Sequence, residues 1–173
     1  ICIGLGSNAG GHDGYSVFEE YLSAVSIQKG DCLCAAAGNE AEARHHTGGV
    51  LRPGEPPGQV DLKVGENAGD VYMAVWNTVA DRLSVSVRSP SGELVGRVPA
   101  KPGIGPAADV KLVLEAARVQ VEYHFPVEGS GGQLTVIRIL GATPGVWNIQ
   151  LHGDILLNGS YQVWLPMTGF VAP

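Results

Sequence analysis

From residue 60 onward the chain repeats short runs in which apolar and polar residues alternate, and this repetition limits the folds that it can adopt. Alternation with a period of two is typical of β-strands that bury one face. Turn sequences such as S-P-S-G and T-P-G separate the runs. The predicted strands are residues 60–64, 71–75, 83–87, 110–114, 119–123, 134–139, 147–151 and 161–165. This spacing predicts a mostly β fold, an antiparallel jelly-roll β-sandwich of about eight strands, with residues 111–118 as an alternative helical turn.

The N-terminal region follows a different pattern, with a helical period between two apolar runs. Residues 1–5 form the first run, and residues 32–37 form the second, which is typical of a strand covered on both faces. Ser16 and Glu19 make an S-x-x-E capping box, which predicts a helix start. The apolar positions at helical spacing are Phe18, Tyr21, Leu22 and Val25, and Gly30 is expected to end the helix. The region is thus predicted to be a strand–helix–strand fragment, one right-handed crossover of a parallel sheet.

Two parallel strands and one helix cannot bury a core alone, so the rest of this sheet is expected in flanking sequence or in a partner. The chain opens at Ile1 inside an apolar run, which favours an excised domain or a processed product. Proline and glycine are frequent in residues 48–59, which predicts a linker or entry loop there. We predict two domains, residues 1–47 and residues 48–173. The uncovered apolar surface of the first makes a homodimer of the fragment a further expectation.

Composition excludes several classes of function. The net charge is −6, from 17 acidic and 11 basic residues, and no Lys/Arg cluster occurs, so nucleic-acid binding is not expected. No apolar run approaches the roughly 20 residues of a membrane helix. The three cysteines, Cys2, Cys32 and Cys34, are too few and wrongly spaced for a disulfide framework or a zinc site. We expect buried reduced thiols, Cys32 and Cys34 on one strand face, and neither a metal nor a cofactor.

The string A-A-A-G-N-E, which runs from Ala35 to Glu40 after the second apolar run, contains the most informative residue. An Asn side-chain amide at the end of a strand can donate to an oxyanion that develops on a scissile carbonyl. The alternative for Asn39 is a Gly-Asn turn that merely caps the strand.

This segment resembles the subtilisin-like serine protease (subtilase) family, through I-G-L-G at residues 3–6 and C-L-C-A-A-A-G-N-E at residues 32–40. The resemblance implies that Asn39 is the oxyanion-hole donor. It also implies substrate-binding roles for the residues around it. Gly4, Leu5 and Gly6 would pair with the substrate backbone, while Ala35, Ala36, Ala37 and Gly38 would line the S1 pocket, which receives the side chain before the scissile bond.

A narrower resemblance covers nearly the whole chain. It is carried by the motifs G-S-N-A-G-G-H-D-G, G-N-E-A-E-A-R-H-H and W-N-I-Q-L-H-G…W-L-P. With these motifs the chain resembles clostridial Csp-type germination proteases, in which a jelly roll is inserted into the catalytic domain. This resemblance implies a spore-associated or secreted parent protein, whose location the sequence itself leaves unknown. It also implies a regulatory or stabilising role for the jelly roll.

The catalytic Asp, His and Ser contexts of subtilases, D-T-G, H-G-T and G-T-S, do not occur. In family order they would lie before residue 1 and after residue 173. We therefore expect the fragment alone to be inactive, with the remainder of the catalytic domain and a peptide or protein substrate as its partners. The alternatives are a non-catalytic protein- or glycan-binding β-sandwich and a pseudoprotease segment.

Other polar and aromatic residues allow rival interpretations. His12 and Asp13 are neighbours in a Gly-rich turn, a poor arrangement for catalysis. His45 and His46, downstream of Glu40 and Glu42, suggest zinc or, more simply, a hinge segment packed against the base of the sandwich. The tryptophans Trp76, Trp147 and Trp164 suggest a carbohydrate platform, but core packing is favoured because each lies among strand residues.

Overall fold

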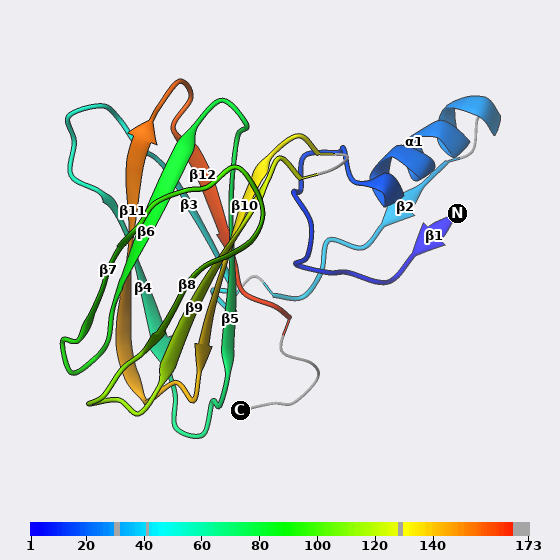
Figure 1. Cartoon of the computed structure of the whole chain (residues 1–173). Coiled ribbons are helices and arrows are strands. Elements are labelled where there is room, and N and C mark those ends of the chain that lie inside the picture. Colours follow the sequence, from blue (N-terminus) through cyan, green and yellow to red (C-terminus); the bar gives the residue numbers. More distant parts are fainter. Residues whose placement is uncertain (30–31, 41, 128–129, 168–173) are drawn as a thin grey trace.

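The computed structural model describes residues 1–29, 32–40, 42–127 and 130–167 (Figure 1). Within these residues the chain forms one helix, α1 (Val17–Lys29), and a series of β-strands. The first strands are β1 (Cys2–Ile3), β2 (Cys34–Ala35), β3 (His46–Val50), β4 (Gly58–Val64), β5 (Val71–Asn77) and β6 (Arg82–Arg88). The others are β7 (Leu94–Val98), β8 (Gly103–Lys111), β9 (Arg118–Phe125), β10 (Gln133–Leu140), β11 (Gly145–Ile155) and β12 (Ser160–Trp164).

The strand–helix–strand fragment stands beside the sandwich (Figure 1). Strands β1 and β2 are parallel, with Cys2 opposite Cys34 and Ile3 opposite Ala35, which confirms the predicted element order and pairing. Each strand has only two residues, fewer than the apolar runs suggested. The predicted capping box starts the helix, because Ser16 N donates to Glu19 Oε2 over 3.1 Å and Glu19 N donates to Ser16 Oγ over 3.3 Å. The predicted helix end at Gly30 lies outside the described residues.

Much of the apolar surface of this N-terminal fragment faces solvent. On α1, Val17, Phe18 and Tyr21 are 78%, 62% and 65% exposed. The prediction that the cysteines are buried is wrong: all three free thiols are exposed, because two short strands and one helix leave them uncovered. Cys32 and Cys34 do share one face, with their Sγ atoms 3.9 Å apart. No helix of the described residues has the length and apolarity needed to cross a membrane.

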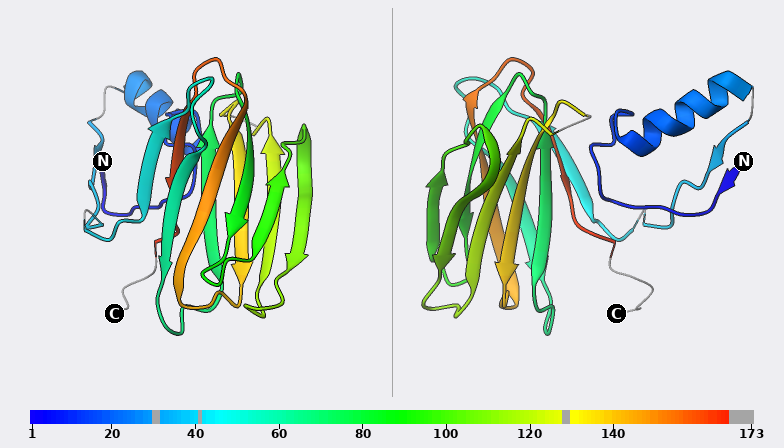
Figure 2. Two further views of the ribbon diagram at one scale, coloured as in Figure 1. Left: turned by 90° about the vertical axis from the view of Figure 1, so that its left-hand side faces the viewer. Right: turned by 45° about the vertical axis from the view of Figure 1, so that its right-hand side comes forward.

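The remaining strands form two facing sheets, in the orders β3-β12-β5-β10-β9-β8 and β4-β11-β6-β7 (Figure 2). Their pairings are antiparallel, which confirms the prediction of a mostly β, antiparallel sandwich. Four pairings nest inside one another, namely β3 with β12, β4 with β11, β5 with β10, and β6 with β7. Such nesting arises when one long hairpin is rolled up, which is the principle of the jelly roll. Strands β8 and β9 extend the larger sheet beside β10.

Strand β3 lies where the sequence suggested a linker. It pairs with β12, and its glycines allow the approach, because a Cβ on Gly49 would lie 2.6 Å from the hydroxyl oxygen of Tyr161. A run of H-T-G-G-V lacks apolar alternation, so no strand was expected. β3 begins at His46, two residues before the start of the second predicted domain, and the division at residues 47 and 48 stays a prediction.

The predicted strand at residues 110–114 is wrong beyond Lys111, where β8 ends, and the alternative helical turn does not form either. Instead the backbone bends around the carboxylate of Glu93. That carboxylate accepts hydrogen bonds from the amides of Val113 and Leu114 over 2.9 and 2.8 Å. An acceptor on a neighbouring hairpin thus replaces strand pairing at this turn.

The core lies between the two sheets and contains the side chains that alternate inward along the strands. Trp147 is fully buried there, as predicted, and its indole N–H donates to the Thr143 carbonyl over 3.0 Å. The prediction of core packing is wrong for Trp76 and Trp164, which are partly exposed. On β5 and β12 they alternate with the core residues Val75 and Val163, and so they lie on the outer face of the larger sheet.

Candidate functional site

The predicted site residues lie on the two chain segments that leave β1 and β2. Gly4, Leu5 and Gly6 follow β1 and are exposed, and a Cβ on either glycine would meet nothing within 4 Å. Their backbone is therefore open to an approaching chain.

The second segment follows β2, whose last residue is the exposed Ala35. Ala36 still belongs to the pairing, since its amide donates to the Ile3 carbonyl over 3.0 Å. Gly38 then adopts a left-handed φ of 85°, which turns the chain at Asn39. Asn39 is exposed, and its side chain has no hydrogen-bond partner among the described residues. The amide is thus available to a ligand.

A hollow of about 510 Å³ is lined by residues of both segments and of the sandwich. Of the predicted residues it brings together Gly6, Ala36, Ala37 and Gly38, whereas Gly4, Leu5, Ala35 and Asn39 lie outside its lining. The other residues that line it are Ser7, Asn8, His12, Glu40, His45, His46, Trp164 and Met167.

A hydrogen-bond network centred on Glu40 forms one side of this hollow. Asn8 Nδ2 donates to Glu40 Oε2 over 2.9 Å and to the Leu165 carbonyl over 3.0 Å. His45 Nδ1 lies 3.1 Å from Glu40 Oε2, and the Leu165 amide donates to the His45 carbonyl over 2.8 Å. The Asn8 hydrogen bond, followed by that of His45, lowers the pKa of Glu40, so this residue is a carboxylate at neutral pH. The network ties both segments to the end of β12.

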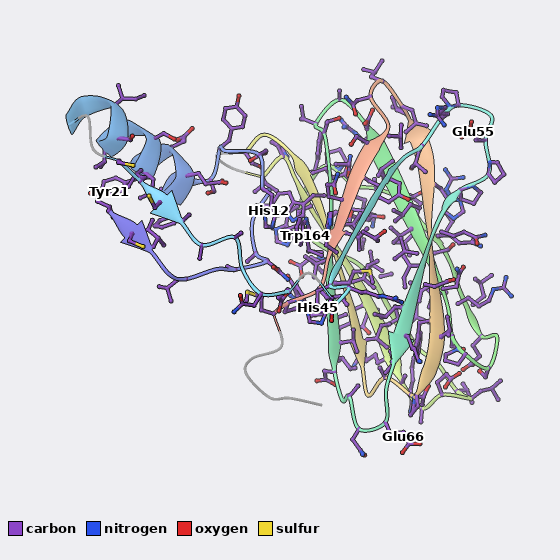
Figure 3. All side chains as sticks on the ribbon, turned by 180° about the vertical axis from the view of Figure 1, so that it is seen from behind. His12, Tyr21, His45, Glu55, Glu66 and Trp164 are labelled. Carbon is purple, nitrogen blue, oxygen red and sulfur yellow. The ribbon has the colours of Figure 1, made fainter. Side chains whose placement is uncertain are left out.

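Three stacked rings form another side of the hollow. Trp164 lies between His12 and His46, with centroid distances of 4.0 and 3.8 Å and interplanar angles of 16° and 25°. Figure 3 shows His12 beside Trp164 at the junction, with His45 close by. His46 Nε2 is also 2.6 Å from Gln162 Oε1. The sequence analysis missed this stack, since His12 and Trp164 are far apart in the chain and no local motif connects them.

The two adjacent histidines do not converge on one point. His45 contacts Glu40, whereas His46 contacts Gln162 and Trp164, and no group of three metal-ligating side chains is found in the part of the chain that the structure describes. His46 is the first residue of β3 and so belongs to the sandwich itself, and the alternative of a hinge segment packed against the base of the sandwich stays a prediction.

A serine–histidine hydrogen bond occurs elsewhere, on the outer face of the smaller sheet. Ser86 Oγ lies 3.0 Å from His152 Nε2, but Ser86 is only 4% exposed. A substrate carbonyl cannot reach such a hydroxyl, so this pair does not serve as a nucleophile and its base. The hollow thus combines small residues of the two segments with a carboxylate and stacked rings, next in the chain to the exposed Asn39.

Comparison with known proteins yields matches among solved structures. No protein-family model matches the sequence, and no curated protein matches it. Among solved structures, the fold is similar to that of the CspB protease from Clostridium perfringens, with a TM-score of 0.79 and 25% sequence identity. The match covers 95% of this chain and 34% of the protease chain, so the chain spans about a third of the solved structure. These values support a distant relationship between this chain and the CspB protease.

Proposed function

We propose that the chain is a segment of a subtilisin-like serine endopeptidase and supplies its oxyanion-hole donor and the S1 side of its substrate site. The observation that carries the proposal is the hollow, which joins Gly6 to Ala36, Ala37 and Gly38 next to the exposed Asn39. The distant relationship to the CspB protease supports a protease-related origin.

Each residue has a distinct role in this proposal. The Asn39 amide donates to the oxygen that becomes negative when the scissile carbonyl is attacked. Gly4, Leu5 and Gly6 pair with the substrate backbone as an added strand, which the open space around both glycines supports. Ala36, Ala37 and Gly38 form one wall of the S1 pocket, since small side chains leave room for a substrate side chain, and Ala35 leads into this wall from β2.

The catalytic Asp, His and Ser come from the remainder of the catalytic domain, so the fragment alone is inactive. The exposed Val17, Phe18 and Tyr21 of α1 offer an apolar surface that this remainder covers, or that a second copy of the fragment covers when the remainder is absent. In this proposal the sandwich stabilises the substrate-binding segments, and the parent enzyme acts in spore germination, by similarity to the Csp-type proteases.

The test compares the purified chain of residues 1–173 with the full-length protein that contains it. We expect the full-length protein to cleave fluorogenic peptides and to react with a fluorophosphonate, and residues 1–173 to do neither. A full-length protein that neither cleaves peptides nor reacts with the fluorophosphonate contradicts the proposal and favours a pseudoprotease. Cleavage by residues 1–173 alone contradicts the assignment of the triad to flanking sequence.

A further inference from the structure

The hollow has walls from two different parts of the chain. Gly6, Ala36, Ala37 and Gly38 come from the segments after β1 and β2, whereas His46 and Trp164 come from strands β3 and β12 of the sandwich. The sandwich therefore contacts the same space that the proposed S1 residues line.

We infer that Trp164 is a specificity-determining residue, and that it makes the S1 pocket selective for peptides with an aromatic residue before the scissile bond. The inference rests on the proposed function, because it names the substrate class of that same site. It gives the sandwich a direct part in substrate choice, beyond mechanical support of the catalytic domain.

The stack decides which part of Trp164 a ligand meets. Both faces of the indole are covered, one by His12 and the other by His46, at centroid distances of 4.0 and 3.8 Å. The indole Nε1 is buried and has no hydrogen-bond partner among the described residues. Trp164 therefore meets the hollow through the C–H groups of its ring edge.

A ring edge carries partial positive charge and a ring face carries partial negative charge, so two aromatic groups favour edge-to-face contact. A phenylalanine or tyrosine side chain in the hollow can present its face to the edge of Trp164. An aliphatic side chain of similar size gains burial there but not this contact. The volume of about 510 Å³ leaves room for a ring.

Charge in the hollow further limits which substrate side chains it can accept. Glu40 lines the same space, and the Asn8 and His45 side chains hold it as a carboxylate. A substrate carboxylate next to it is disfavoured by like-charge repulsion. Glu40 therefore excludes acidic side chains from the substrate class, and the preference for an aromatic side chain rests on Trp164.

The experiment uses the full-length protein and two fluorogenic peptides that differ only in having Phe or Leu before the scissile bond. We expect the wild type to prefer Phe, and Trp164→Leu to lower the ratio of the two kcat/KM values about three- to tenfold. Trp164→Phe, which keeps a ring between the imidazoles, should restore most of the ratio. Trp76→Leu, on the same outer face but outside the hollow, should leave the ratio unchanged. If Trp164→Leu does not fold, Trp164→Met replaces it.

A wild type without preference for Phe overturns the inference, and so does a Trp164→Leu variant that loses activity equally on both peptides, since a purely structural role predicts equal loss. If the full-length protein neither cleaves the peptides nor reacts with the fluorophosphonate, the proposed function fails. The preference is then measured as the ratio of the dissociation constants of the two peptides. If the protein binds the Phe peptide more tightly and Trp164→Leu removes this preference, the role of Trp164 in selecting an aromatic side chain is supported. Absence of that preference, or of binding, overturns it.

Discussion

Replacement of Asn39 by alanine in the full-length protein is expected to lower kcat about 100- to 1000-fold and to change KM little. That magnitude is the one measured for the oxyanion donor of a subtilisin, and it is carried over to this chain rather than calculated for it. The physical reason is that the amide gains its strongest hydrogen bond only when the carbonyl oxygen becomes negative, so its loss affects the transition state more than substrate binding. Steady-state kinetics with one peptide substrate measures both constants.

The matched control is Asn148→Ala on β11, where Asn148 Nδ2 donates to Asp61 Oδ1 over 2.7 Å, away from the hollow. It removes the same functional group and should leave kcat unchanged. An Asn39→Ala enzyme with wild-type kcat would show that this residue is only the turn that ends β2.

Replacement of Asp81 by alanine is expected to destabilise the chain by about 2–4 kcal/mol, because it removes one acceptor from several donors. Asp81 is fully buried, and it accepts from the amides of Leu157, Asn158 and Gly159 over 2.6, 2.9 and 2.8 Å. The hydroxyl of Thr78 donates to it as well, over 3.0 Å. Alanine leaves these donors without their acceptor at the connection between β11 and β12. Urea denaturation at pH 7 measures the loss.

The control for this variant is Asp109→Ala, which removes an exposed carboxylate paired with Arg118. Exposed ion pairs contribute little, so the loss of unfolding free energy should be much smaller than for Asp81→Ala. Equal effects of the two substitutions would show that the backbone amides around Asp81 find other partners.

The same carboxylate makes stability depend on pH. Burial raises the pKa of Asp81, but the hydrogen bonds from the amides of Asn158, Leu157 and Gly159 together outweigh burial and lower it. The pKa of Glu115 is lowered to about 2, chiefly by its hydrogen bond from the Thr143 hydroxyl and then by Ser91. Both groups stabilise the fold fully above their unfolded-state pKa values of about 4, and this stability is lost as the pH falls through the lower folded-state values. Asp81→Ala should therefore flatten the decrease in unfolding free energy between pH 5 and pH 3.

Most of the sandwich could be predicted because its strands bury one face, so their sequences alternate. Val119, Val121 and Tyr123 of β9, for example, all point into the core. Strand β3 could not be predicted, since the requirement for glycine at Gly49 comes from Tyr161, far away in the sequence. The bend after Lys111 depends in the same way on Glu93 of another hairpin.

In the candidate site, too, the residues in local motifs could be predicted and those brought together by long-range pairing could not. Gly6 and the residues Ala36 to Gly38 stand in short motifs, and a motif can be read locally. The wall formed by Trp164 requires β12 to lie beside β3 and the segment after β1 to fold back, and each of these depends on long-range pairing. Burial of the cysteines was predicted wrongly for a related reason, because an apolar run indicates that a surface needs covering but not which chain covers it.

In the proposed enzyme, Asn39 faces the reacting carbonyl of a peptide bound between Gly6 and Gly38. The most direct measurement is a crystal structure of the full-length protein with a peptide aldehyde that forms a tetrahedral adduct with the catalytic serine. We expect the adduct oxygen to lie about 2.7–3.1 Å from Asn39 Nδ2. We also expect the peptide backbone to pair with Gly4 to Gly6 and the last side chain to fill the hollow against Trp164. An adduct whose oxygen is held by other groups, with Asn39 turned away and the hollow empty, would contradict the proposal.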